Sequence, residues 1–151
     1  MLVKFKLNGK DVEVDVSPNE ILLDTLRLKL GVRSVKRGCE RGECGTCTIL
    51  LNGNPVTSCL ILTPQVEGAE VITVEGLEED QKFRELVNNF VNEGAIQCGF
   101  CTPGFLLTAY AAVINQKIKT IDDIKKSLEG NLCRCTGYVK IIEAVAKTAL
   151  K

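Results

Sequence analysis

The chain opens with two short runs in which hydrophobic and polar residues alternate. Residues 3–7 alternate, Asn8-Gly9 follows, and residues 12–16 alternate again. Alternation with a period of two gives a strand one apolar face, and Asn-Gly favours the tight turn of a hairpin. The pattern therefore predicts a β-hairpin in this part of the chain.

The next segment changes from strand spacing to helix spacing. Ser17-Pro18-Asn19-Glu20 has the features of a helix start: an N-cap Ser, a Pro in the first turn and a capping-box Glu. Hydrophobic residues follow from Ile21 to Leu30, and Gly31 can end the helix. Further strands are predicted at Thr48–Leu51, Val56–Leu60 and Val71–Val74. Two strands, a helix, a cysteine loop and further strands follow the β-grasp order of small ferredoxins.

Beyond the acidic segment Glu75–Asp80 the pattern is almost entirely helical. Four helices are predicted. They are marked by an apolar stripe over residues 83–91 that Gly94 closes, by Thr102-Pro103, by a capping box over Thr120-Ile121-Asp122-Asp123 and by an N-cap at Thr136. The second of them is apolar almost all round from Phe105 to Ile114, so we expect it at the centre of a bundle. The predicted fold class is α+β, with a β-grasp domain over residues 1–76 and a four-helix bundle over residues 77–151.

Composition narrows the possible functions. The 151 residues are 45% hydrophobic with a formal net charge of +0, which gives no electrostatic reason to expect nucleic acid or an anionic membrane as a partner. With no His, no Trp and only two Tyr, the chain has few of the usual groups for acid–base catalysis or base stacking. No signal-peptide core and no apolar run of membrane-spanning length is visible, so we expect a cytoplasmic protein, in which clustered thiols more often bind metal than form disulfides.

The eight cysteines fall into two quartets that differ in spacing. The first has the spacing C-x4-C-x2-C-x11-C and consists of Cys39, Cys44, Cys47 and Cys59. Its opening is the spacing of plant-type [2Fe–2S] ferredoxins, and Gly38, Gly42 and Gly45 are expected to supply the unusual φ values and close approach of a wrapped loop. The number of residues between Cys47 and Cys59 is smaller than the corresponding number in plant-type ferredoxins, so the match to that group is partial. The alternative is a structural zinc site, although such sites usually use C-x2-C pairs.

The second quartet has the spacing C-x2-C-x31-C-x1-C and consists of Cys98, Cys101, Cys133 and Cys135. On spacing alone these thiols suit zinc as well as iron. Each pair directly precedes a predicted helix start, so the positive ends of two helices are expected to face one site. This arrangement favours a centre that becomes more negative on reduction, and therefore an iron–sulfur cluster over a static zinc ion.

Four segments occur in the order CERGECGTCTILLNG, SCL, QCGFCTPG and GNLCRCTGY. In these segments the chain resembles the small iron–sulfur subunit of the molybdenum hydroxylases. That family comprises xanthine dehydrogenase, aldehyde oxidoreductase and carbon monoxide dehydrogenase, and the resemblance covers essentially the whole chain. It implies two [2Fe–2S] clusters, a large partner subunit that binds molybdopterin and a medium partner subunit that binds FAD. The second quartet would lie near the molybdopterin and the first nearer the flavin, with Gln97 and Cys135 contacting the pterin.

The same resemblance implies an electron-transfer subunit without catalytic residues, through which electrons pass singly from molybdenum to the second quartet, then to the first, then to FAD. We expect the substrate of the holoenzyme to be an aldehyde, with carbon monoxide or an N-heteroaromatic compound as further possibilities. Two alternatives stay open on the sequence. One is a free-standing two-cluster ferredoxin, and the other is a zinc-stabilised structural module.

Overall fold

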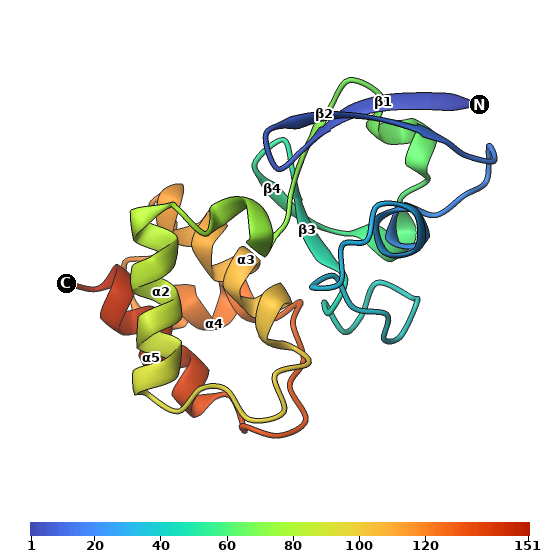
Figure 1. Cartoon of the computed structure of the whole chain (residues 1–151). Helices are drawn as coiled ribbons and strands as arrows, with labels where there is room; N and C mark the ends of the chain where they lie inside the picture. Colours follow the sequence, from blue (N-terminus) through green and yellow to red (C-terminus); the bar gives the residue numbers. More distant parts are fainter.

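The computed structural model describes residues 1–151, which fold into two halves that lie side by side (Figure 1). The N-terminal half contains strands β1 (Leu2–Leu7), β2 (Lys10–Asp15), β3 (Thr48–Leu51), β4 (Asn54–Thr57) and β5 (Glu70–Ile72). Its short helix α1 (Leu22–Asp24) continues as a π-helical turn over Thr25–Lys29. The C-terminal half contains helices α2 (Gln81–Asn92), α3 (Thr102–Ile114), α4 (Ile121–Leu128) and α5 (Val139–Ala149). Short 3₁₀ turns lie at Ser58–Leu60, Thr63–Val66 and Val74–Leu77.

The five strands form one mixed sheet in the order β2-β1-β5-β3-β4. β1 pairs antiparallel with β2 and parallel with β5, while β3 pairs antiparallel with both β5 and β4. Asn8 and Gly9 form the predicted hairpin turn, with φ of 51° and 80°. Inward-facing side chains of the strands pack against Leu22, Leu23 and Leu26 of the helical segment and form the core of this half. The predicted β-grasp half is confirmed.

The first helix begins later than the sequence predicted. Ser17–Glu20 do not start it, because Ile21 has an extended backbone and forms an isolated β-bridge with Leu62. In addition, the N–H of Leu22 donates to the carbonyl of Ile61 at 2.8 Å. Pairing with this distant segment keeps the backbone out of the helical conformation until Leu22, so a tertiary contact overrides the local capping signal.

The strand predicted at Val56–Leu60 is also shorter in the structure. β4 ends at Thr57, and the chain enters a 3₁₀ turn that the N–H of Ile61 closes on the carbonyl of Ser58 at 3.4 Å. The N–H and the hydroxyl of Ser58 both donate to the carbonyl of Cys47, at 3.2 and 2.7 Å, and hold this turn beside the cysteine loop. Cys59 therefore lies on a 3₁₀ turn beside Cys47 and not on the strand itself.

The four helices of the second half form the predicted bundle, with α3 at its centre and buried along most of its length. Asp80 caps α2 by accepting a hydrogen bond from the N–H of Phe83 at 2.8 Å. Thr120 and Asp123 form the capping box predicted for α4. No helix of the chain combines the length and the apolar character needed to cross a membrane.

The predicted N-cap of the last helix at Thr136 is wrong. α5 begins at Val139, and Tyr138 at its N-cap position has a left-handed backbone with φ of 72°. The reason is that both the N–H and the hydroxyl of Thr136 point to the sulfur of Cys133. The hydroxyl oxygen also accepts from the N–H of Tyr138 at 3.2 Å, so Thr136 closes the turn before the helix and does not cap α5.

The two halves meet where α3 lies against β3 (Figure 1). Leu50 of β3 belongs to the hydrophobic core of the bundle, and Ile72 and Val74 pack against the same core. The sheet half therefore contributes side chains directly to the helical half. The domain boundary between residues 76 and 77 stays a prediction, and the 3₁₀ turn Val74–Leu77 runs across it.

Candidate metal centres

The first quartet lies on the loop before β3 and on the turn after β4. The loop contributes Cys39, Cys44 and Cys47, and the turn contributes Cys59. Gly42 and Gly45 both have φ of 74°, a left-handed conformation that favours glycine, as the sequence predicted. Gly38 does not have a positive φ. A Cβ there would lie 2.7 Å from Thr46 Oγ1 and 2.8 Å from Cys44 Sγ, so close approach is what requires this glycine.

Backbone donors surround the sulfur of Cys39. The N–H groups of Arg41 and Glu43 lie 3.3 Å from Cys39 Sγ, and that of Cys44 lies 3.4 Å away. These hydrogen bonds, led by the one from Arg41, lower the pKa of the Cys39 thiol to about 6. The hydroxyl of Thr46 lies 3.2 Å from the neighbouring Cys44 Sγ. The loop thus favours the thiolate form, which is the form that binds a metal.

The other two thiols of the first quartet are buried together. Cys47 and Cys59 are 3% and 6% exposed, and their side chains interact. Burial raises the pKa of Cys47 to about 11, so this thiol needs a bound metal to offset the desolvation of its thiolate. The first quartet therefore has an outer pair among backbone donors and an inner pair in an apolar environment.

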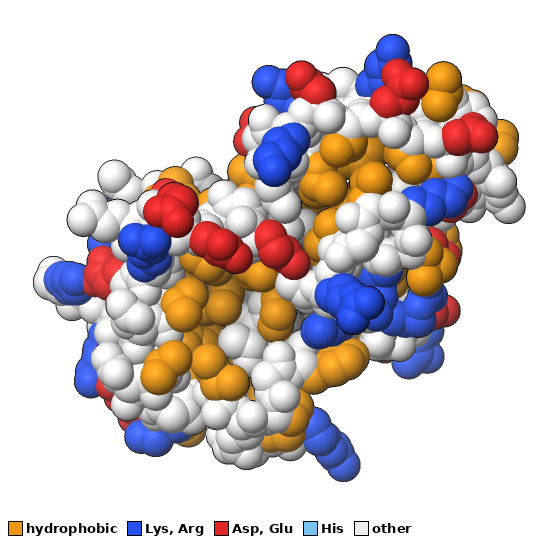
Figure 2. Space-filling view, in the orientation of Figure 1, with side chains coloured by type: hydrophobic (Ala, Val, Ile, Leu, Met, Phe, Trp, Pro, Cys, Tyr) orange, Lys and Arg blue, Asp and Glu red, His pale blue; other side chains and the backbone are white.

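Carboxylates balance the basic residues of this loop. Arg37 forms ion pairs with Asp24 and Glu40, and Arg41 pairs with Glu43 at 3.1 Å. Acidic and basic side chains are present on both halves of the face shown in Figure 2. The hydrogen bonds to sulfur in the first quartet come from the backbone N–H groups of Arg41, Glu43 and Cys44.

Two loops of the bundle bring the second quartet together. Cys98 and Cys101 lie between α2 and α3, and Cys133 and Cys135 lie between α4 and α5. All four residues line one cavity of about 450 Å³. α3 begins at Thr102, directly after Cys101, so its positive N-terminus adjoins the site as predicted. The start of α5 lies farther along the chain than predicted, so only one helix begins directly at a cysteine.

The cavity arranges its thiols as an inner and an outer pair. Cys101 faces Cys133, and burial together with this neighbouring thiol raises the pKa of Cys101 to about 12. Cys98 and Cys135 are both exposed, and the hydrogen bond between their side chains raises the pKa of Cys135. Both quartets thus consist of two facing pairs.

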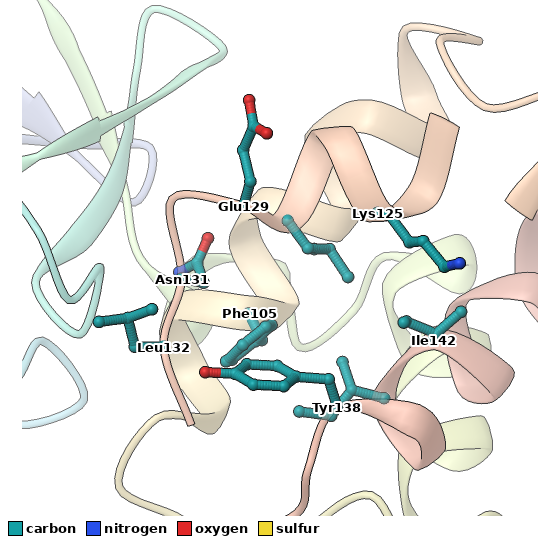
Figure 3. Close-up of a pocket in the computed structure, with 9 residues that line it drawn as sticks. Phe105, Lys125, Glu129, Asn131, Leu132, Tyr138 and Ile142 are labelled. Atoms are coloured by element: carbon teal, nitrogen blue, oxygen red, sulfur yellow. The ribbon is translucent and has the colours of Figure 1, made fainter. Parts of the chain in front are cut away.

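Thr136 and Tyr138 hold the loop that carries Cys133. Thr136 donates to Cys133 Sγ from its hydroxyl at 3.1 Å and from its N–H at 3.4 Å. Burial raises the pKa of Cys133, but hydrogen bonds, led by the two from Thr136 and joined by those with Cys135 and Cys101, lower it overall. The hydroxyl of Tyr138 accepts from the N–H of Cys133 at 3.2 Å, and its ring lies 6.4 Å from that of Phe105. Both rings line a separate apolar cavity of about 270 Å³ beside this loop (Figure 3).

The facing pairs fit a two-iron cluster better than a single metal ion. A structural zinc ion needs four ligands around one point, whereas a [2Fe–2S] cluster takes two ligands on each of two irons. Pairs such as Cys47–Cys59 and Cys101–Cys133 match the two-iron arrangement. The donor sets are therefore suited to [2Fe–2S] clusters.

Comparison with known proteins agrees with this chemistry. Residues 5–77 match the 2Fe-2S iron-sulfur cluster binding domain, and residues 73–146 match the [2Fe-2S] binding domain. The nicotinate dehydrogenase small FeS subunit of Eubacterium barkeri is 47% identical, over 95% of this chain and 91% of that protein. The xanthine dehydrogenase iron-sulfur-binding subunit of Escherichia coli O157:H7 is 41% identical, over 95% of this chain and 91% of that protein. A chain of quinoline 2-oxidoreductase from Pseudomonas putida 86 superposes with a TM-score of 0.93 at 43% identity, covering 99% of this chain and 93% of that one.

This chain belongs to the small iron–sulfur subunits of the molybdenum hydroxylase family. As a small iron–sulfur subunit, it is a non-catalytic component of an oxidoreductase complex. Its two halves are both [2Fe–2S]-binding domains, which confirms the two-cluster composition expected from the cysteine quartets.

The small subunit presents one edge of its second quartet to solvent. Gln97, Cys98 and Cys135 are all exposed, and Phe100 is 46% exposed in the wall of the same cavity. Phe105, in contrast, is 1% exposed and lies behind the cysteine loop. The exposed edge is where groups outside the chain can reach this centre.

Several residues that surround the cysteines of the small subunit were not identified from the sequence. Thr46 and Thr136 contact thiol sulfurs, Tyr138 fixes the backbone of Cys133, and Asn131 lies between the two cysteine loops. The two threonines could have been predicted from the sequence, because each lies within two residues of a cysteine and hydroxyls commonly donate hydrogen bonds to metal-binding thiols. Asn131 had none, because its partner is distant in sequence.

Proposed function

We propose that this subunit carries electrons through two [2Fe–2S] clusters, from molybdopterin in a large partner subunit to FAD in a medium partner subunit. The proposed ligands are Cys39, Cys44, Cys47 and Cys59 for the first cluster and Cys98, Cys101, Cys133 and Cys135 for the second. The observation that supports this most is that the cysteines lie as facing pairs in two linked domains. When bound, such clusters take up and release single electrons.

The side chains and backbone of the subunit would set the reduction potentials of the two clusters. Three N–H groups point to the sulfur of Cys39, and the hydroxyl and N–H of Thr136 point to that of Cys133. Hydrogen bonds to sulfur stabilise added negative charge and raise the reduction potential of a cluster. Phe105 and the buried pair Cys47–Cys59 restrict access of water to the two centres.

We assign the exposed edge of the second quartet to the interface with the large subunit. Leu132 and Phe100 are 49% and 46% exposed and line the same cavity as the exposed ligands Cys98 and Cys135. Apolar side chains that gather around exposed ligands are typical of a surface that a partner covers. In this arrangement Gln97 and Cys135 contact the pterin.

The two alternative functions have weaker support. A free-standing ferredoxin would leave Leu132 and Phe100 in solvent beside its redox centre, which is unfavourable. A zinc-stabilised module does not agree with the match of both halves to [2Fe-2S] binding domains.

The substrate depends on the large subunit. The three relatives described above are named for nicotinate, xanthine and quinoline, which are nitrogen heterocycles. We therefore propose an N-heteroaromatic substrate beside the aldehyde expected from the sequence, with carbon monoxide as a third possibility. A cytoplasmic location likewise stays a prediction.

The test uses the complex of this subunit with its two partners. In the wild type, substrate should reduce both clusters, and analysis should find about four irons and four acid-labile sulfides per chain. In Cys135→Ser, substrate should no longer reduce the first cluster, while dithionite still does. Arg134→Lys, an exposed neighbour without an ion pair, is the matched control. Intact reduction by substrate in Cys135→Ser, or zinc in place of iron in the wild type, would overturn the proposal.

A further inference from the structure

The two cysteine loops touch each other at one small contact. The carbonyl of Cys44 accepts a hydrogen bond from the N–H of Leu132 at 2.9 Å. The side-chain amide of Asn131 donates to the carbonyl of Gly45 at 3.2 Å. These are the two hydrogen bonds that join residues 1–73 to residues 78–151. Both join the loop of the first quartet to the segment that precedes Cys133 of the second quartet.

Asn131 is enclosed at this contact. It is 4% exposed, and it lies on the segment that follows α4, beside the strands of the N-terminal half (Figure 3). A buried amide usually has a hydrogen-bond partner, and the carbonyl of Gly45 is the partner here. The hydroxyl and the N–H of Thr48, within the same half, also donate to this carbonyl, at 2.7 and 3.2 Å. Loss of Asn131 would therefore remove the donor that reaches the carbonyl of Gly45 from the opposite half, while the bonds from Thr48 stay.

Two glycines permit the close approach. A Cβ on Gly104 of α3 would lie 2.3 Å from the carbonyl oxygen of Gly45 and 3.2 Å from Asn131 Nδ2. A Cβ on Gly45 would lie 2.5 Å from Asn131 Nδ2. Gly104 is within a helix and has no positive φ, so the backbone conformation does not require glycine there. Space for the opposite loop is what requires it.

We propose that Asn131 is a positioning residue that, together with Gly104, fixes the distance between the two clusters. The inference rests on the proposed electron-transfer function. Cys44 is a proposed ligand of the first cluster, and Leu132 directly precedes Cys133, a proposed ligand of the second. The hydrogen bond between Cys44 and Leu132 therefore joins a proposed ligand of the first cluster to the residue next to a proposed ligand of the second. Because electron tunnelling slows steeply with distance, a small shift of this contact changes the rate between them.

The contact also explains why an asparagine suits this position. Its amide reaches across to Gly45, while the next residue supplies the backbone N–H to Cys44. Two adjacent residues thus bind two adjacent residues of the opposite loop, which fixes both translation and rotation of one loop on the other. A single hydrogen bond would leave the rotation free.

The experiment compares Gly104→Ala and Asn131→Ala with Gly130→Ala in the full chain carrying both clusters. Gly104→Ala raises helix propensity but places a methyl group against the carbonyl of Gly45. Asn131→Ala removes the donor without adding bulk. Gly130→Ala is the matched control, because a Cβ at Gly130 meets nothing within 4 Å and its φ is not positive.

Two measurements decide the inference. Hydrogen exchange at the N–H of Leu132 should be about tenfold faster in Gly104→Ala and Asn131→Ala, the factor that corresponds to one lost buried hydrogen bond. The magnetic splitting between the two reduced clusters in EPR should shrink, while the midpoint potential of each cluster stays at its wild-type value. A residue that only stabilised the fold would not change the splitting selectively.

The outcomes separate the two claims. Unchanged splitting and unchanged exchange in both variants would overturn the role of Asn131 while leaving the electron-transfer function intact. A wild-type chain without iron would instead remove the proposed function, and exchange at Leu132 would still show whether the contact forms. Equal effects in Gly130→Ala would also contradict the inference, because that substitution leaves the contact untouched.

Discussion

The hydroxyl of Thr136 donates a hydrogen bond to the sulfur of Cys133 over 3.1 Å. Reduction of a cluster adds negative charge to such a sulfur, and the hydroxyl stabilises it. We therefore predict that Thr136→Val lowers the midpoint potential of the second cluster by on the order of 20–60 mV, as expected for one hydrogen bond. A redox titration followed by EPR measures this shift. Thr136→Ser keeps the hydroxyl and should retain the wild-type potential; an unaltered potential in Thr136→Val would exclude the role.

Gly38 tests the packing of the first centre. Because its Cβ would lie 2.7 Å from Thr46 Oγ1 and 2.8 Å from Cys44 Sγ, Gly38→Ala should displace Cys44. We expect the variant to lose the EPR signal of the first cluster and to keep that of the second. Gly130→Ala, which adds a methyl group in open space, should keep both signals. Loss of both signals in Gly38→Ala would mean that the two centres do not form independently.

Substitutions at Phe105 and Phe100 should affect different properties: the first the stability of the fold, the second the binding of the large subunit. Phe105 is 1% exposed in the core of the bundle, so Phe105→Ala should lower the free energy of unfolding by about 3–5 kcal/mol. Phe100 is 46% exposed at the proposed interface, so Phe100→Ala should change that free energy by no more than about 0.5 kcal/mol. It should instead weaken binding to the large subunit about tenfold. Denaturant unfolding and a binding titration distinguish them, and wild-type affinity in Phe100→Ala would argue against the assigned surface.

Tyr110 should make the free energy of unfolding of the helical half decrease at alkaline pH. Its hydroxyl donates to Asp80, the cap of α2, at 3.0 Å, and burial followed by this hydrogen bond raises its pKa from 10.0 to about 12. A group whose pKa is raised on folding contributes stability below its unfolded pKa and loses it as the pH rises through the folded pKa. The wild type should therefore exceed Tyr110→Phe by about 1 kcal/mol at pH below 10 and lose this advantage toward pH 12. Denaturant titrations of both proteins across this range provide the measurement, and a constant difference would contradict the link.

The local sequence pattern correctly predicted those elements whose stabilising contacts lie between residues close in sequence. The hairpin around Asn8-Gly9 and the capping box of Thr120 and Asp123 depend on residues a few positions apart, and both formed as predicted. The sequence grouped Cys101 and Cys133 in one quartet but did not predict that these two face each other, because that pairing depends on how the helices of the bundle pack.

Tertiary contacts explain the parts that pattern did not predict. The bridge from Ile21 to Leu62 delays the first helix, although the sequence before it has the features of a cap. Thr136 was predicted to cap α5 because a threonine before a helical stretch usually does. Its hydroxyl instead donates to the sulfur of Cys133 and accepts from the N–H of Tyr138, ahead of the helix. Asn131 shows the same limit, since its partner Gly45 lies on the opposite half of the chain.

The central claim is that the two quartets each bind a separate [2Fe–2S] cluster, and EPR of two serine variants tests it most directly. The wild-type chain, reduced with dithionite, should give two distinguishable signals. Cys47→Ser should alter or abolish the first cluster's signal alone, and Cys101→Ser the second cluster's signal alone, because each removes a buried ligand of one quartet. A chain that gives no iron-dependent signal, or variants that both affect the same signal, would contradict the assignment of the eight cysteines.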